Sequence, residues 1–129
     1  MTRIFCDGST SLICYVIGGQ APVVKPALED GGKVTNNQGE YYAILLALQE
    51  ARRQGIKDVE LISDSQLIVN QLTLDNLGVP LYKSKEIRMR DLRNLVWSLA
   101  KQFNSVKYTW QRRNNPAGKI LDRVGKDVL

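Results

Sequence analysis

The spacing of apolar residues changes near residue 36, and this change constrains the fold more than any other feature of the chain. Before it, three short apolar runs at residues 2–6, 11–17 and 21–28 are separated by turn residues. Such runs predict strands in an antiparallel meander, and Pro22 and Pro26 place the third strand at a sheet edge. After residue 36, helical spacing predicts a helix, with a buried face that contains Ile44, Leu45, Ala47, Leu48 and Ala51.

The second half alternates between strands and helices. Residues 59–63 and 106–111 predict two more strands, residues 65–72 a short helix and residues 85–103 a long one, and a last helix can begin at Pro116. The buried stripe of the long helix is predicted to contain Leu92, Leu95, Val96, Leu99 and Phe103.

This order of elements predicts an α/β fold with a mixed five-stranded sheet. Strands joined by helical crossovers run parallel, so strands 1–3 should form the antiparallel meander and strands 4 and 5 should be parallel. Helices are expected to flank the sheet. We expect residues 1–129 to form a single domain, since 129 residues match the usual size of one.

The composition limits where the protein acts and which metals it can bind. No run approaches the roughly 18 apolar residues of a membrane span, and the N-terminal residues lack the apolar core of a signal peptide, so we expect a cytoplasmic protein. Cys6 and Cys14 lie in apolar runs and are expected to be small buried residues. Because the chain has no histidine, metal ligands must be carboxylates, which favours Mg²⁺ or Mn²⁺.

The chain has a net charge of +5, from 18 basic and 13 acidic side chains, and its basic residues are concentrated in the second half. Such a distribution suits a polyanionic partner. It is equally typical of the solvated faces of amphipathic helices, so charge alone does not decide between these interpretations. The two basic groups are Lys83, Lys85, Arg88, Arg90 and Arg93, and Lys101, Lys107, Arg112, Arg113, Lys119, Arg123 and Lys126.

Three acidic residues occupy positions that suggest a common site. Asp7 and Asp64 each directly follow an apolar strand, where an acid can also serve as a turn residue or a helix cap. Glu40 lies on the same face of its helix as Ile44 and Ala47, where an ionised carboxylate is costly unless it is paired or bound to a metal. Its place in the first turn also allows a structural role, because the helix dipole stabilises a negative charge there.

These acids can converge at the carboxyl ends of neighbouring strands, where sheets of this kind usually bind ligands. Clustered carboxylates repel one another and need a counter-charge, which divalent cations supply. Two such cations about 4 Å apart can catalyse phosphodiester hydrolysis. The predicted cluster suits that chemistry.

Three motifs closely resemble the core motifs of type 1 ribonuclease H. They are Cys-Asp-Gly-Ser at residues 6–9, Thr-Asn-Asn-Gln-Gly-Glu-Tyr-Tyr-Ala at residues 35–43 and Ser-Asp-Ser-Gln-Leu-Ile-Val at residues 63–69. The resemblance covers essentially the whole chain, and three motifs in this order are far more specific than any one of them. It implies a ribonuclease H-like fold.

The resemblance also implies hydrolysis of the RNA strand of an RNA/DNA hybrid to 5′-phosphomonoesters, with two Mg²⁺ or Mn²⁺ ions per site when substrate is bound. Asp7, Glu40 and Asp64 would hold these ions. The implied substrate contacts are minor-groove contacts from Asn36, Asn37 and Gln66, neighbouring contacts from Ser9 and Thr10, and a DNA phosphate contact from Thr35.

The C-terminal motif departs from the family pattern, in which an Arg-x-x-Asn loop is followed by Ala-Asp at the start of the last helix. Here Ala117 is followed by Gly118, and the next acid is Asp122. We take Asp122 as the fourth metal ligand and Asp127 as its alternative; a helix-surface role is the third interpretation. Many family members also have a histidine in this loop, and this chain has none. Arg113, Asn114 or Asn115 would take over part of the role of that histidine, unless turnover is simply slower.

Other protein classes fit the sequence less well. A signalling receiver domain would need adjacent acids after its first strand, and an actin-like or sugar-kinase phosphate loop would need a second domain. The closer alternatives are a nuclease of the same fold that acts on another nucleic acid, and a non-catalytic nucleic-acid-binding domain. We expect a monomer that binds RNA/DNA hybrid and no membrane.

Overall fold

The computed structural model describes the backbone of residues 1–128 and the side chains of residues 1–124. Its order of strands and helices is the one predicted from the sequence. The elements are β1 (Thr2–Gly8), β2 (Leu12–Ile17), β3 (Val23–Pro26), α1 (Asn36–Arg53), β4 (Asp58–Ser63), α2 (Gln66–Leu72), α3 (Ile87–Ala100), β5 (Ser105–Trp110) and α4 (Pro116–Val128).

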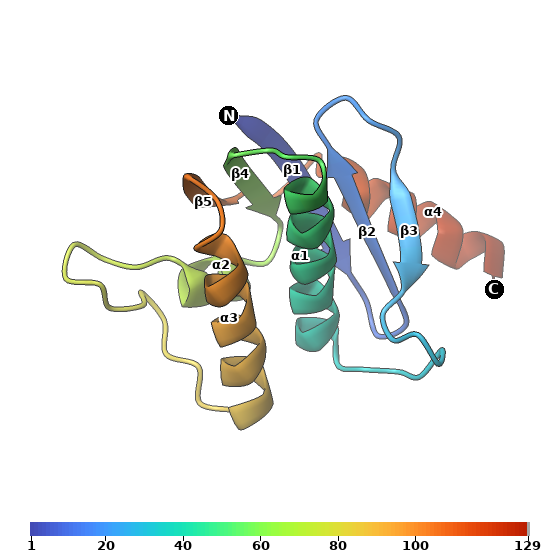
Figure 1. The fold of residues 1–129 in the computed structure, drawn as a ribbon. Coiled ribbons are helices and arrows are strands. Elements are labelled where there is room, and N and C mark those ends of the chain that lie inside the picture. Colours follow the sequence, from blue (N-terminus) through green and yellow to red (C-terminus); the bar gives the residue numbers. More distant parts are fainter. Residues whose placement is uncertain (129) are drawn as a thin grey trace.

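The five strands form one mixed sheet in the order β3-β2-β1-β4-β5 (Figure 1). β1, β2 and β3 pair antiparallel, whereas β1, β4 and β5 run parallel. The predicted meander, the parallel pair and the edge position of the third strand are therefore confirmed. The first strand extends beyond its predicted end to Gly8, and the third is shorter than predicted.

Helices cover both faces of the sheet. Alternate residues of β2 point to opposite faces, so they pack against different helices. Ile13, Tyr15 and Ile17 belong to the core shared with α1 and α3. Cys14 and Val16 pack instead against Ala117 and Leu121 of α4, on the other face. Figure 1 shows α1 and α3 side by side in front of the sheet and α4 behind it.

The two cysteines are fully buried and unbonded, as expected from their apolar runs. Cys6 belongs to the core on the α1 face and Cys14 to the core on the α4 face. Alternation along paired strands thus places them on opposite sides of the sheet. None of the helices in the described part of the chain is long and apolar enough to cross a membrane.

The predicted buried stripe of α3 is wrong at one position. Leu92, Val96 and Leu99 are buried as predicted, but Leu95 is 54% exposed. Leu95 lies at the margin of the stripe, and a helix that packs along a single line of contact buries only the residues that face it. Phe103 is buried, but it lies beyond the end of the helix at Ala100.

Candidate active site

Asp7 and Asp64 lie level with each other at the carboxyl ends of two neighbouring parallel strands. The pairing of β1 with β4 ends at Phe5 and Ile62, and each acid lies two residues further along. Asp64 directly follows β4, as predicted. Asp7 was predicted to follow its strand directly, but it lies within β1 and pairs with Cys14 of β2.

Two glycines allow α1 to approach β1 closely enough to bring a third acid to this point. A Cβ atom at Gly8 would overlap the carbonyl group of Gly39, and a Cβ atom at Gly39 would overlap the carbonyl group of Ser9. Glycine is thus needed on both sides of the contact, where backbone meets backbone. Glu40, the next residue of α1, is held beside Asp7 as a result.

The side chains of Asp7, Glu40 and Asp64 form a compact cluster, with one carboxylate oxygen of each within 4.8 Å of the others. Glu40 is only 8% exposed. Its Oε2 accepts a long hydrogen bond of 3.5 Å from the hydroxyl of Ser63, a fully buried residue that the sequence analysis did not select. The Ser63 oxygen in turn accepts from the Ser65 amide at 3.1 Å.

The surroundings of the cluster disfavour the ionised form of its carboxyl groups. Burial raises the pKa of Glu40 to about 10, with help from a hydrogen bond to Asp7 and from the charges of Asp7 and Asp64. Burial is also the main reason that the pKa values of Asp7 and Asp64 are raised. A divalent cation would supply the missing counter-charge, and an all-carboxylate donor set suits a hard cation. The residues therefore fit a Mg²⁺ or Mn²⁺ centre.

Asp122 lies near this cluster but outside its tight core. It is exposed and does not belong to the group of oxygens within 4.8 Å of one another. Its negative charge nevertheless contributes to the raised pKa values of Asp7 and Asp64, so it lies near both. The side chain of the alternative residue, Asp127, lies outside the described residues.

The predicted substrate-binding residues surround the same end of the sheet. Two of their hydroxyls already serve the local structure: Thr35 Oγ1 caps α1 by accepting from the Gln38 amide at 3.1 Å, and Ser9 Oγ donates to the Leu12 carbonyl at 3.1 Å. These bonds fix the α1 N-terminus and the turn between β1 and β2. The remaining predicted contacts have exposed side chains: Thr10, Asn36, Asn37 and Gln66.

Basic side chains lie beside the N-terminus of α1. A cavity of about 350 Å³ between α1 and α3 is lined in part by Lys33, Arg88 and the buried Gln38. Lys33 lies two residues before the capping Thr35, and Arg88 lies in the first turn of α3. Asp91, which has the opposite charge, also lines this cavity.

Asn115 holds α4 against β1 next to the acids. Its Oδ1 accepts from the amides of Ala117 and Gly118 at 2.9 and 3.3 Å, and its Nδ2 donates to the Cys6 carbonyl at 3.1 Å. It is buried and its hydrogen bonds are used structurally, unlike the exposed Asn114. An Asn-Pro pair at the start of a helix is a capping signal, so the sequence itself indicates the structural role of Asn115.

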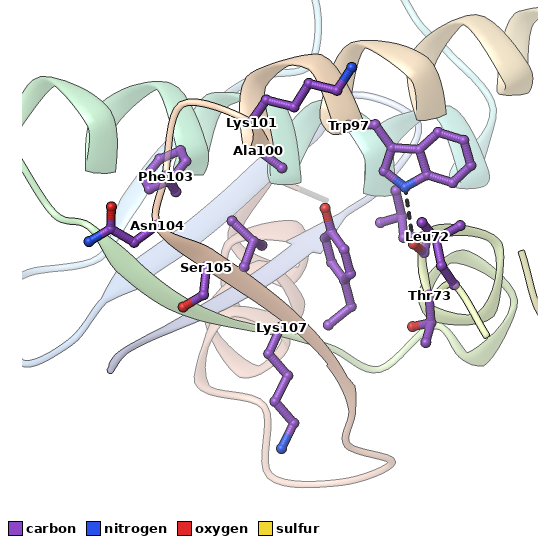
Figure 2. Close-up of a pocket in the computed structure, with 12 residues that line it drawn as sticks. Leu72, Thr73, Trp97, Ala100, Lys101, Phe103, Asn104, Ser105 and Lys107 are labelled. Carbon is purple, nitrogen blue, oxygen red and sulfur yellow. Dashed lines mark hydrogen bonds between the residues drawn. The ribbon is translucent and has the colours of Figure 1, made fainter. Parts of the chain in front are cut away.

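A second hollow, of about 690 Å³, lies between α3 and β5 and shares no residue with the acidic cluster (Figure 2). Trp97 borders it and donates a hydrogen bond of 3.0 Å from Nε1 to the Leu72 carbonyl. Trp110 likewise donates to the Asp64 carbonyl, at 3.1 Å. Both tryptophans thus have structural roles. The walls of the hollow are mainly apolar, so the acidic cluster remains the better candidate for hydrolytic chemistry.

Comparison with known proteins gives one family and several similar structures. A family model described as reverse transcriptase-like matches residues 19–117. Ribonuclease HI of Halobacterium salinarum is 37% identical over 86 residues, which are 66% of this chain but only 43% of that protein. The crystal structure of ribonuclease H1 from the same archaeon aligns with a TM-score of 0.75 and 26% identity, covering 95% of this chain and 98% of that one.

A structure of LC11 ribonuclease H1 in complex with an RNA/DNA hybrid has a similar fold. It aligns with a TM-score of 0.77 over the full length of both chains, at 22% identity. At this identity the likeness concerns the fold, including the mixed sheet and its flanking helices.

Proposed function

Because the chain belongs to the reverse transcriptase-like family, whose fold is that of ribonuclease H, we propose that it is a ribonuclease H that cuts the RNA strand of RNA/DNA hybrids. The observation that carries this proposal is the cluster of Asp7, Glu40 and Asp64 at the carboxyl ends of β1 and β4. The complex of LC11 ribonuclease H1 with a hybrid supports the choice of substrate.

We assign the metal site to these three acids and to Asp122, which approaches from α4. Mg²⁺ is the proposed ion, with Mn²⁺ as a substitute and two ions per site in the presence of substrate. The ions would activate the attacking water and stabilise the leaving oxygen, giving 5′-phosphomonoesters. The raised pKa values of Glu40, Asp7 and Asp64 support this assignment, because bound cations would stabilise the ionised carboxylates.

The protein side chains position the acids and exclude water from part of the site. Ser63 and the Gly8–Gly39 contact hold Glu40 in place, while burial keeps its carboxyl group away from bulk solvent. The chain has no histidine, so water and carboxylates are the proposed groups for proton transfer near neutral pH. We therefore propose catalysis without a histidine.

Polar groups at the N-termini of α1 and α2 would hold the hybrid. Asn36, Asn37 and Gln66 are exposed. They would contact the minor groove of the hybrid, where 2′-hydroxyls distinguish RNA from DNA. Ser9 and Thr10 lie in the neighbouring turn.

Phosphate contacts would come from the region of Thr35 and from basic residues of the second half, such as Arg88 beside α1. Such contacts fix the position of the duplex without reading its sequence, so binding should weaken as salt is raised. We propose that the protein acts as a monomer in the cytoplasm.

The proposal is tested by incubating the protein and Mg²⁺ with labelled RNA/DNA, RNA/RNA and DNA/DNA duplexes. The test variant is Asp64→Asn, and the matched control is Asp58→Asn, the same change at the opposite end of β4, where Asp58 only accepts a hydrogen bond from Ser105. We expect cleavage of the hybrid's RNA strand by the native chain and by the control.

Cleavage by Asp64→Asn at the native rate would contradict the assignment of the site. Cleavage of DNA/DNA or RNA/RNA in preference to the hybrid would favour a nuclease of the same fold with another substrate. Hybrid binding without any cleavage would favour a non-catalytic binding domain.

A further inference from the structure

The short helix α2 is held in the fold largely by apolar contacts. It has seven residues, Gln66–Leu72, and begins directly after Asp64 and the capping Ser65. Ile68 and Leu72 pack it into the core on the α1 face. Such contacts have no preferred direction, so by themselves they leave a short helix free to rotate or slide by small amounts.

One buried hydrogen bond ties α2 directly to α1. The hydroxyl of Tyr41 donates to Oε1 of Gln71 at 2.6 Å, and the two residues are 30 positions apart in the chain. Tyr41 is fully buried and Gln71 is 5% exposed. Within the part of the chain that the structure describes, no other side-chain hydrogen bond joins these two helices. A hydrogen bond needs a defined distance and angle, so this one fixes how α1 and α2 lie relative to each other.

Two other hydrogen bonds join α2 to later parts of the chain. Trp97 of α3 donates to the Leu72 carbonyl (Figure 2), and the backbone amide of Tyr82 donates to the Asn70 carbonyl. They hold the C-terminal half of α2 against α3 and the loop that precedes α3. They involve no atom of α1, so they do not act directly on the spacing between α1 and α2.

A polar side chain at position 71 is costly for stability alone. The other buried residues of α2 are apolar: Ile68, Val69 and Leu72. Burial of a glutamine side chain costs free energy that its hydrogen bond offsets only in part, and an apolar pair of the same shape is often as stable. What the bond adds to an apolar contact is its fixed geometry.

The two helices joined by this bond carry proposed contacts to the same minor groove. Gln66 is the first residue of α2, Asn36 and Asn37 are the first residues of α1, and all three are exposed. The bond lies within about one and a half turns of both helix starts, because five residues or fewer separate it from each of them. The spacing of the exposed amide groups therefore depends on it.

We propose that Tyr41 and Gln71 are positioning residues that hold Gln66 at the spacing from the two asparagines of α1 at which all three meet the minor groove of an RNA/DNA hybrid. This inference rests on the proposed function. The acids do not depend on the bond, since the Gly8–Gly39 contact and the ends of β1 and β4 place them. Loss of the bond should therefore weaken the grip on the hybrid and leave turnover of the bound hybrid unchanged.

The test measures KM and kcat of the full chain for a labelled RNA/DNA hybrid with Mg²⁺, together with the melting temperature of each variant. Tyr41→Phe removes only the hydroxyl and should raise KM by about threefold to tenfold, with kcat within about twofold of the native value. Tyr108→Phe is the matched control. It removes a buried tyrosine hydroxyl that has no hydrogen-bond partner among the described residues, so KM should stay unchanged.

Two double variants separate positioning from stability. Tyr41→Phe with Gln71→Met replaces the polar pair by apolar groups of similar shape, so the melting temperature should return toward the native value while KM stays raised. Gln66→Ala should raise KM by itself, and the addition of Tyr41→Phe should raise it no further, because Tyr41 acts through Gln66.

A native KM in Tyr41→Phe, or in its combination with Gln71→Met, would overturn this inference, and so would a further rise of KM when Tyr41→Phe is added to Gln66→Ala. Hybrid cleavage in those cases would leave the proposed function standing. A native KM in Gln66→Ala would overturn the proposed groove contact and the inference with it. No cleavage of the hybrid by the native chain would overturn the inference and the proposed function together.

Discussion

Replacing Glu40 with glutamine tests the charge balance of the site directly. Glu40 is buried in the first turns of α1, and burial, together with Asp7 and Asp64, raises its pKa from 4.5 to about 10. Glutamine has nearly the same shape but cannot ionise. The variant therefore separates the cost of the charge from the packing of the side chain.

The sign of the effect follows from the direction of the shift. A carboxyl group whose pKa is higher in the folded state contributes stability that is complete below about pH 4.5 and is lost as the pH rises toward about 10. Each pKa unit corresponds to roughly 1.36 kcal/mol, so by about pH 8 the ionisable group costs on the order of 4 kcal/mol. This is a large part of the 5–15 kcal/mol or so that stabilises a typical domain.

The measurement is the free energy of unfolding in urea, with EDTA present, for the native chain and Glu40→Gln. The variant should be more stable by on the order of 4 kcal/mol near pH 8 and by less than about 1 kcal/mol near pH 5. Added Mg²⁺ should narrow the gap near pH 8, because it binds the folded native chain. Glu29→Gln, at an exposed loop position, is the control and should show a pH-independent difference.

A difference between Glu40→Gln and the native chain that stays constant from about pH 5 to about pH 8 would refute this reasoning. It would mean that the site holds the charge of Glu40 at little cost without a metal.

Three further substitutions test the contacts that assemble the site. Gly39→Ala should destabilise the protein by more than about 3 kcal/mol in urea unfolding, because its Cβ would overlap the carbonyl of Ser9; a loss below about 1 kcal/mol would show that α1 can shift freely. Asn115→Ala should cost about 2–3 kcal/mol, since it removes a helix cap and leaves the Cys6 carbonyl without its donor, and an unchanged urea midpoint would contradict both roles. Trp97→Phe removes one indole hydrogen bond and should cost about 1 kcal/mol by the same assay, with near-UV circular dichroism reporting whether the native packing remains.

Local signals in the sequence were sufficient for most of the elements. Runs of apolar residues with period two, turn residues between them and the helical spacing after residue 36 predicted all five strands and four helices in the correct order. Errors occurred where a neighbouring element decides the outcome. Leu95 has the right residue type for a buried stripe, but whether it is buried depends on what lies opposite that side of α3.

The three central acids were predictable for a similar reason. Strand ends and helix faces are local properties, so Asp7, Glu40 and Asp64 could be selected from spacing and motif alone. Their separation could not, because it depends on the register of β1 with β4 and on the approach of α1 to β1. The metal and substrate roles of these residues are predictions, which the cleavage experiment tests.

The sequence by itself determined which residues are strand, helix and acid, since these depend on side chains a few positions apart. Only the tertiary structure decided how close the acids come, because Gly8 and Gly39, 31 positions apart in the chain, meet backbone to backbone. It also decided which groups Gly118 faces, since a Cβ atom there would lie 3.5 Å from Asp7 Oδ2 and 3.8 Å from Asp64 Oδ2. Asp7 and Asp64 come near Gly118 from the ends of strands that are distant along the chain and adjacent in space.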